Sequence, residues 1–167
     1  MANTFVKIAS VIVGSGGTGE IVFSSIPQIY TDLKVLISSR QSNSAVVNTL
    51  NIGFNGSYTS VASRYVAGDG SSVTSSLSAS GLIGDTNANS STSNTFGSLE
   101  VYIPNYTGST NKIYSSDSVS ENNATTAYAE LWAGLRSNSA AITELRFSGS
   151  GSFMQYSTIT LYGIKNS

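Results

Sequence analysis

The sequence predicts an all-β fold with many loops, and two observations support this prediction. Charged residues make up only 10% of the 167 residues, against about 25% in an ordinary globular domain. Their place is taken by Ser, Thr, Asn and Gly, which favour turns and are weak helix formers. Short stretches that alternate apolar and polar residues also recur between turn signals, a pattern typical of a β-sandwich or barrel. We therefore expect about ten short strands in a single domain spanning residues 1–167.

The first half of the chain contains five expected strands. Residues 5–13 are β-rich and end in the turn GSGGTG at 14–19, so we expect them to form a hairpin with residues 20–24. Residues 26–32 are a connection, because Pro27 cannot donate to a central ladder. Clean alternation then predicts strands at 33–39, 48–55 and 61–67, the second with Leu50, Ile52 and Phe54 facing inwards.

Residues 71–95 contain nine serines and no aromatic ring, and alone they resemble a disordered linker. Strand patterns continue on both sides, and a structureless loop of this length is uncommon inside a compact domain. We expect 71–84 to pack on the core through Val73, Leu77, Leu82 and Ile83, as short edge strands. We expect 85–95 to project as a candidate subunit contact, because Asp85–Thr95 has no large apolar group.

The second half contains five more candidate strands. Residues 123–137 allow two interpretations: Tyr128, Leu131, Trp132 and Leu135 have helical spacing, but the segment also alternates between an Ala/Leu face and a Tyr/Glu/Trp face. Gly134 and the all-β context favour a strand. Alternation or β-rich composition predicts the other four strands at 98–104, 111–119, 142–148 and 156–164.

Composition argues against several classes of function. The net charge is −1 and the Lys and Arg residues are scattered, whereas binding nucleic acid needs several converging cations. Without His or Cys, neither a Ser-His-Asp nor a Cys-His arrangement is possible, nor are the usual zinc sites. No apolar run approaches about 18 residues, so we expect no membrane span and no membrane among the partners. Met1–Phe5 lacks the start of a signal peptide, so we expect no secretory address.

Oxygen-rich and glycine-rich motifs give no stronger sign of chemistry. GSGGTG is not followed by the Lys-Ser/Thr that a phosphate-binding loop requires. DGSS at 69–72 and DTNAN at 85–89 lack EF-hand spacing, so we interpret them as Asx-type turns rather than calcium sites. Two of the nine carboxylates would suffice for a glycosidase, but nothing in the sequence pairs any two. We expect no catalytic residue, no metal and no cofactor, hence no enzyme.

Aromatic residues are the best candidates for contacts with a partner. The chain has nine tyrosines and one tryptophan, and tyrosine is enriched at interfaces because it buries a large area while keeping a polar end. Trp132 or Tyr106 could also stack on a sugar. We further expect the N-terminal segment Met1–Lys7 to make contacts. The candidate interface residues are Phe5, Tyr30, Tyr102, Tyr106, Tyr128 and Trp132.

Three stretches resemble a family of small virion proteins of tailed phages, including cyanophages. They are IPQIYTDLKVLISSR at 26–40, the segment from EVYIPNY to ITELRF at 100–147, and QYSTITLYGIKNS at 155–167. Together they cover well over half of the chain. The resemblance implies a jelly-roll-like antiparallel β-sandwich that assembles as trimers and decorates the capsid or sits on tail fibres. It carries no catalytic motif.

The leading hypothesis is therefore a homotrimeric capsid decoration, or cement, protein that binds the major capsid protein. We expect it to be assembled in the host cytoplasm and to lie on the outer surface of the virion. Such a protein stabilises the shell by its binding free energy. The alternative is a receptor-binding or carbohydrate-binding module of a tail fibre or spike, for which a host glycan would be the partner.

Overall fold

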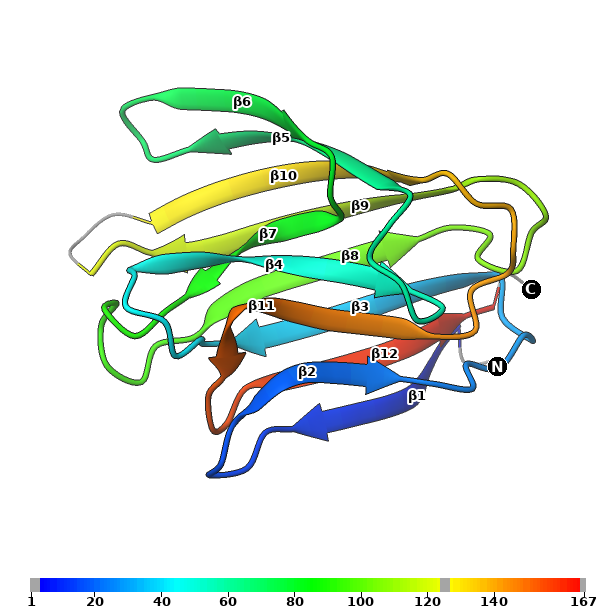
Figure 1. Cartoon of the computed structure of the whole chain (residues 1–167), viewed down its shortest axis with the longest axis horizontal. Coiled ribbons are helices and arrows are strands. Elements are labelled where there is room, and N and C mark those ends of the chain that lie inside the picture. The colour runs from blue at the N-terminus through cyan, green and yellow to red at the C-terminus, as the bar shows by residue number, and fades with distance from the viewer. Residues whose placement is uncertain (1–3, 124–126, 166–167) are drawn as a thin grey trace.

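The computed structural model describes residues 4–123 and 127–165, and these residues form twelve β-strands and no helix. All strand pairs are antiparallel. The larger sheet contains, in spatial order, β1 (Phe5–Ile12), β12 (Thr158–Ile164), β3 (Asp32–Ser39), β8 (Gly97–Ile103), β9 (Lys112–Glu121), β10 (Ala127–Arg136), β5 (Val61–Gly68) and β6 (Val73–Ser78). The smaller sheet contains β2 (Thr18–Phe23), β11 (Leu145–Phe153), β4 (Val47–Phe54) and β7 (Leu82–Asn87). The predicted all-β sandwich is confirmed (Figure 1).

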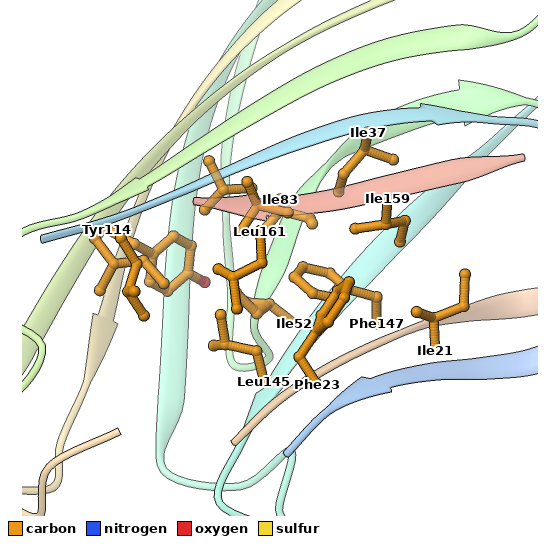
Figure 2. Close-up of a cluster of buried hydrophobic side chains, with 14 of the residues drawn as sticks. Ile21, Phe23, Ile37, Ile52, Ile83, Tyr114, Leu145, Phe147, Ile159 and Leu161 are labelled. Carbon is orange, nitrogen blue, oxygen red and sulfur yellow. The ribbon is translucent and has the colours of Figure 1, made fainter. Parts of the chain in front are cut away.

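The core lies between the two sheets and is apolar where β2, β11 and β4 cover β12, β3 and β8. Figure 2 shows Phe23 and Phe147 of the smaller sheet beside Ile159 and Leu161 of the larger one. The rings of Phe23 and Phe147 meet edge to face at 6.2 Å. Leu50, Ile52 and Phe54 of β4 are buried, as their alternation predicts.

The expected hairpin between residues 5–13 and 20–24 is wrong. β1 pairs with β12 in the larger sheet, whereas β2 pairs with β11 in the smaller one. The glycine-rich loop between them therefore passes from one sheet to the other. Gly17 makes this possible, because its φ is 65° and a Cβ there would lie 2.8 Å from the Phe153 carbonyl oxygen.

The strand interpretation of 123–137 is confirmed for Ala127–Arg136, and residues 124–126 lie outside the described residues. The more apolar side of β10 faces outwards, although apolar side chains usually face the core. Trp132, Gly134 and Arg136 point into the sandwich, and Leu131 and Leu135 point outwards.

The expected behaviour of residues 71–95 is also largely reversed. β6 is an edge strand, as predicted, but Val73 and Leu77 are 77% and 67% exposed and do not reach the core. β7 does anchor this region, because Ile83 is fully buried. The part expected to project lies against the domain instead.

The Arg40 side chain helps to hold residues 88–95, the segment after β7, in place. Arg40 is 95% buried, and its guanidinium donates from Nη1 to the Thr92 and Thr95 carbonyls at 2.7 and 3.0 Å and from Nη2 to the Ser91 carbonyl at 3.1 Å. Backbone bonds from Ala88 to Val46 and from Ser90 to Ala45 fix the start of the same segment. The Glu121 carboxylate adds to this by accepting from the Thr92 backbone N–H at 2.7 Å and from Thr95 Oγ1 at 3.0 Å, so a serine-rich loop without large apolar groups is ordered by two charged side chains.

Candidate interaction surface

The outward side of the larger sheet is unusually apolar over β8, β9, β10, β5 and β6. Single exposed apolar residues are normal on proteins, but a contiguous group marks an interaction site. We call this group the outer apolar face. It consists of Tyr102 on β8, Ile113 and Val119 on β9, Leu131 and Leu135 on β10, Val66 on β5, and Val73 and Leu77 on β6, each at least 36% exposed.

Strand register makes these side chains neighbours. Leu131 lies opposite Val66 on β5, and Leu135 lies opposite Ile113 on β9. Directly paired residues on one face of an antiparallel sheet have Cβ atoms about 4.5–5.5 Å apart. The register therefore joins Leu131 to Val66 and Leu135 to Ile113, and Asp117 on β9 borders the first of these apolar pairs, opposite Leu131.

The opposite, inward side of the same strands is polar where β7 covers it. Ser116 Oγ donates to the Ile83 carbonyl at 2.6 Å, and Ser118 Oγ donates to Glu130 Oε2 at 2.8 Å. β7 can approach β9 closely because residue 84 is glycine: a Cβ there would lie 2.5 Å from Ser118 Oγ. In this part of the sandwich, buried hydrogen bonds lie beside apolar core residues such as Ile83, and further apolar side chains face outwards.

Two carboxylates meet in this polar interior, although nothing in the sequence pairs them. Glu130 Oε2 accepts hydrogen bonds from the Asp85 backbone N–H at 2.8 Å and from Trp132 Nε1 at 2.9 Å. Thr49 donates to Asp85 Oδ1 at 2.5 Å. Burial, together with the neighbouring Glu130 charge, raises the pKa of Asp85 to about 6. These bonds join β4, β7, β9 and β10 and give the pair a structural role.

The outer apolar face contains a groove of about 600 Å³. Ala62, Arg64, Tyr102, Pro104, Ile113 and Leu135 contribute to its lining. Tyr102 is fixed in place because its hydroxyl donates to Asp32 Oδ2 at 2.7 Å, and this hydrogen bond raises the pKa of Tyr102. Arg64 is exposed, and no hydrogen bond or ion pair to another described residue holds its guanidinium. The groove thus combines apolar walls with one available cation.

Two of the six predicted interface residues are accessible on the outward side of the larger sheet. Tyr102 lines the groove, and Phe5 is 51% exposed on β1, with the Lys34 amine 5.7 Å from the centre of its ring. Tyr30 and Tyr128 are half-buried. Tyr30 packs over Gly163, where a Cβ would lie 2.3 Å from its ring. Of the expected N-terminal contact segment, residues 1–3 lie outside the described part of the chain.

The predictions for Tyr106 and Trp132 are wrong, because both side chains are buried. Tyr106 is fully buried, and its hydroxyl donates to the Pro27 carbonyl. Trp132 is 97% buried and stacks on Tyr65 with the ring centres 4.5 Å apart. Neither ring presents a free face to a sugar or a protein partner.

Sequence reasoning missed the residues at the centre of the outer apolar face, Leu131, Leu135, Ile113 and Val66. On β9, Ser116, Ser118 and Ser120 alternate with Ser115, Asp117 and Val119, so the sequence gives no strong apolar side. Serines on a strand are ordinarily expected to face outwards, whereas here the Ile83 carbonyl of β7 and the Glu130 carboxylate accept hydrogen bonds from Ser116 and Ser118 on the inward side.

The turn predicted at DGSS is confirmed, whereas the turn predicted at DTNAN is wrong, because Asp85, Thr86 and Asn87 belong to β7. Asp69 Oδ1 accepts the backbone N–H groups of Ser71 and Ser72 at 2.8 and 2.7 Å, as an Asx-type turn requires, and these bonds lower its pKa. Within residues 4–123 and 127–165, no group of three or more acidic side chains could hold a metal ion. The same residues contain no helix that is long and apolar enough to span a membrane.

Comparisons of this chain with protein-family models, with curated proteins and with solved structures give no match.

Proposed function

We propose that this protein is a structural subunit of a tailed-phage particle that decorates the capsid and binds the shell through its outer apolar face. The observation that most supports this proposal is the inverted arrangement of β9 and β10, with serines inside and Leu131, Leu135 and Ile113 outside. Exposing these side chains to water is unfavourable by about 25 cal/mol per Å² of apolar area. A surface that is covered in the assembled particle accounts for them.

The proposed mechanism is binding that favours the assembled shell. A protein that binds only the assembled form stabilises it by RT ln(1 + [L]/Kd), about 2.7 kcal/mol when its concentration is 100 times the Kd. A homotrimer, which we retain as part of the proposal, would add avidity without new contacts. The free Arg64 at the rim of the groove favours a carboxylate on the facing protein.

The alternative, a glycan-binding module of a tail fibre, receives less support. It depends on aromatic stacking by Trp132 or Tyr106, and both are buried. The groove is lined mainly by aliphatic side chains, whereas a sugar needs several polar partners. A protein surface suits this lining better.

The proposal is tested by adding purified protein to capsids that lack it. We expect saturable binding, with hundreds of copies per particle. Leu135→Lys should abolish binding, because it places a charge between Ile113 and Ala62 in the groove of the outer apolar face. Ile29→Lys is the matched control, since Ile29 is 65% exposed on the 24–31 connection, outside that face. Absence of occupancy at stoichiometric excess of the wild type, or equal binding by both variants, would overturn the proposal.

A further inference from the structure

β6 ends the larger sheet with an edge that nothing in the described chain covers. It pairs with β5 alone, and every residue from Val73 to Leu77 is exposed. In Figure 1, the β5–β6 hairpin lies at the top of the molecule, past β7 of the smaller sheet. One row of backbone N–H and C=O groups on β6 is therefore available to another strand.

The other sheet edges carry features that oppose pairing. β1 has an irregular register between Lys7 and Ala9, and the Lys7 side chain is exposed. β2 carries Glu20, in an ion pair with Arg146. The backbone of β7 next to its free edge is engaged, since the Ile83 carbonyl and the Asp85 N–H bond to β9 and β10 side chains.

β6 has none of these protections. Its sequence, VTSSLS, contains no charge, no proline and no glycine. Charges, prolines and bulges are the usual means of preventing edge strands from pairing. Their absence from this edge alone points to a strand that is meant to be covered.

The side chains of β6 indicate what covers it. Val73, Ser75 and Leu77 share the outward side with Val66 and Arg64 of β5. This row is apolar, polar, apolar, and so it matches itself when reversed about Ser75. An antiparallel copy centred on Ser75 places Val73 of each strand opposite Leu77 of the other, which gives two identical apolar pairs.

The positions of the charged residues near β6 also favour antiparallel pairing of the two copies. Arg64 pairs with Leu77 at one end of the hairpin, and Asp69 lies in the turn at the other end. Antiparallel pairing brings Arg64 of each copy to the end where Asp69 of the other copy lies. Parallel pairing would instead place like charges at the same end, which is unfavourable.

We propose that β6 pairs with β6 of a second copy about a two-fold axis at Ser75, joining two eight-stranded sheets into one. The contact is isologous, so each copy offers the same strand. It lies at the sheet edge and leaves the groove at Tyr102 and Ile113 open. The inference therefore goes beyond the proposed function: two-fold contacts of this kind would connect neighbouring subunits or trimers whatever shell they bind.

The test uses cysteine cross-linking, for which this chain is well suited because it contains no cysteine. Under mild oxidation, Ser75→Cys should form a covalent dimer, because the axis sets the two residues opposite each other within disulfide range. A mixture of Val73→Cys and Leu77→Cys proteins should cross-link to each other, whereas Val73→Cys alone should not. Ser10→Cys, on the exposed surface of the opposite edge strand, is the matched control and should stay monomeric.

Sedimentation of the uncross-linked protein provides a second readout. Ser75→Lys places two like charges across the axis and should raise the dissociation constant of self-association at least tenfold, whereas Ser10→Lys should leave it unchanged. The inference is overturned if Ser75→Cys links no faster than Ser10→Cys, if Val73→Cys links to itself, or if Ser75→Lys associates like the wild type. None of these results depends on capsid binding, so failure here is distinguishable from failure of the proposed function.

Discussion

Replacing Arg40 with Met should loosen the 88–95 segment and destabilise the whole domain. The Asn89 and Thr92 carbonyls are in exposed residues, so water can replace the guanidinium there at little cost. The Ser91 carbonyl is in a residue that is 95% buried, and a buried acceptor without a donor costs about 1–3 kcal/mol. The lost charge-assisted bond to Ser91 Oγ, 2.8 Å long, adds about 1.5 kcal/mol. We expect a loss of about 3 kcal/mol.

The measurement is urea unfolding, followed by the fluorescence of Trp132, the only tryptophan. Lys7→Met is the control, because it removes an exposed cation and should change the free energy of unfolding by less than about 0.5 kcal/mol. Hydrogen exchange gives a local readout: the amides of Ala88 and Ser90 should lose protection in the variant. A loss below about 1 kcal/mol, or unchanged protection at both amides, would refute the reasoning.

Three further changes probe the polar interior. In the wild type, Asp85 binds a proton more tightly when folded, with a pKa raised to about 6, so its contribution to stability is complete below pH 3.8 and is lost as the pH rises through 6. The free energy of unfolding of Asp85→Asn should therefore be close to that of the wild type at pH 4 and about 3 kcal/mol higher at pH 8. Urea titrations at the two pH values measure this difference, and an equal difference at both would contradict the prediction. Gly134→Ala places a Cβ 1.8 Å from the Tyr114 ring and should lower the free energy of unfolding by about 3 kcal/mol. Adding Tyr114→Leu should restore part of this loss, and an unchanged thermal unfolding of Gly134→Ala would contradict the prediction. Trp132→Phe removes the indole N–H bond to Glu130 and should cost about 2 kcal/mol by circular dichroism, whereas a neutral result would mean that water replaces the bond.

Local patterns were sufficient to predict the strands but not their partners. The alternation at 48–55 and 98–104 identifies both strands and their inward faces, because an apolar sheet covers each of them. The failed hairpin at 5–24 shows the limit. β1 pairs with a strand about 150 residues away, and no feature near Phe5 distinguishes that partner from the adjacent one.

The interaction surface could not be predicted because the inward face of β10 depends on the strand that covers it. β7 offers Gly84 and Asp85 at that position, so the Glu130 and Trp132 side of β10 hydrogen-bonds to it and the leucines remain outside. Arg40 is a similar case. Its neighbours in sequence are serine and glutamine, which suggest an exposed position, and its burial arises from a loop about 50 residues further along.

The position of β12 has a consequence for how the chain is made. β12 is the last strand of the described residues, yet it lies between β1 and β3 in the larger sheet. Until Thr158–Ile164 has left the ribosome, the first strand has no partner and the facing edge of β3 is open. Folding of this sheet must then wait until Thr158–Ile164 has been made, which favours slow folding and a need for chaperones while the apolar strands are exposed.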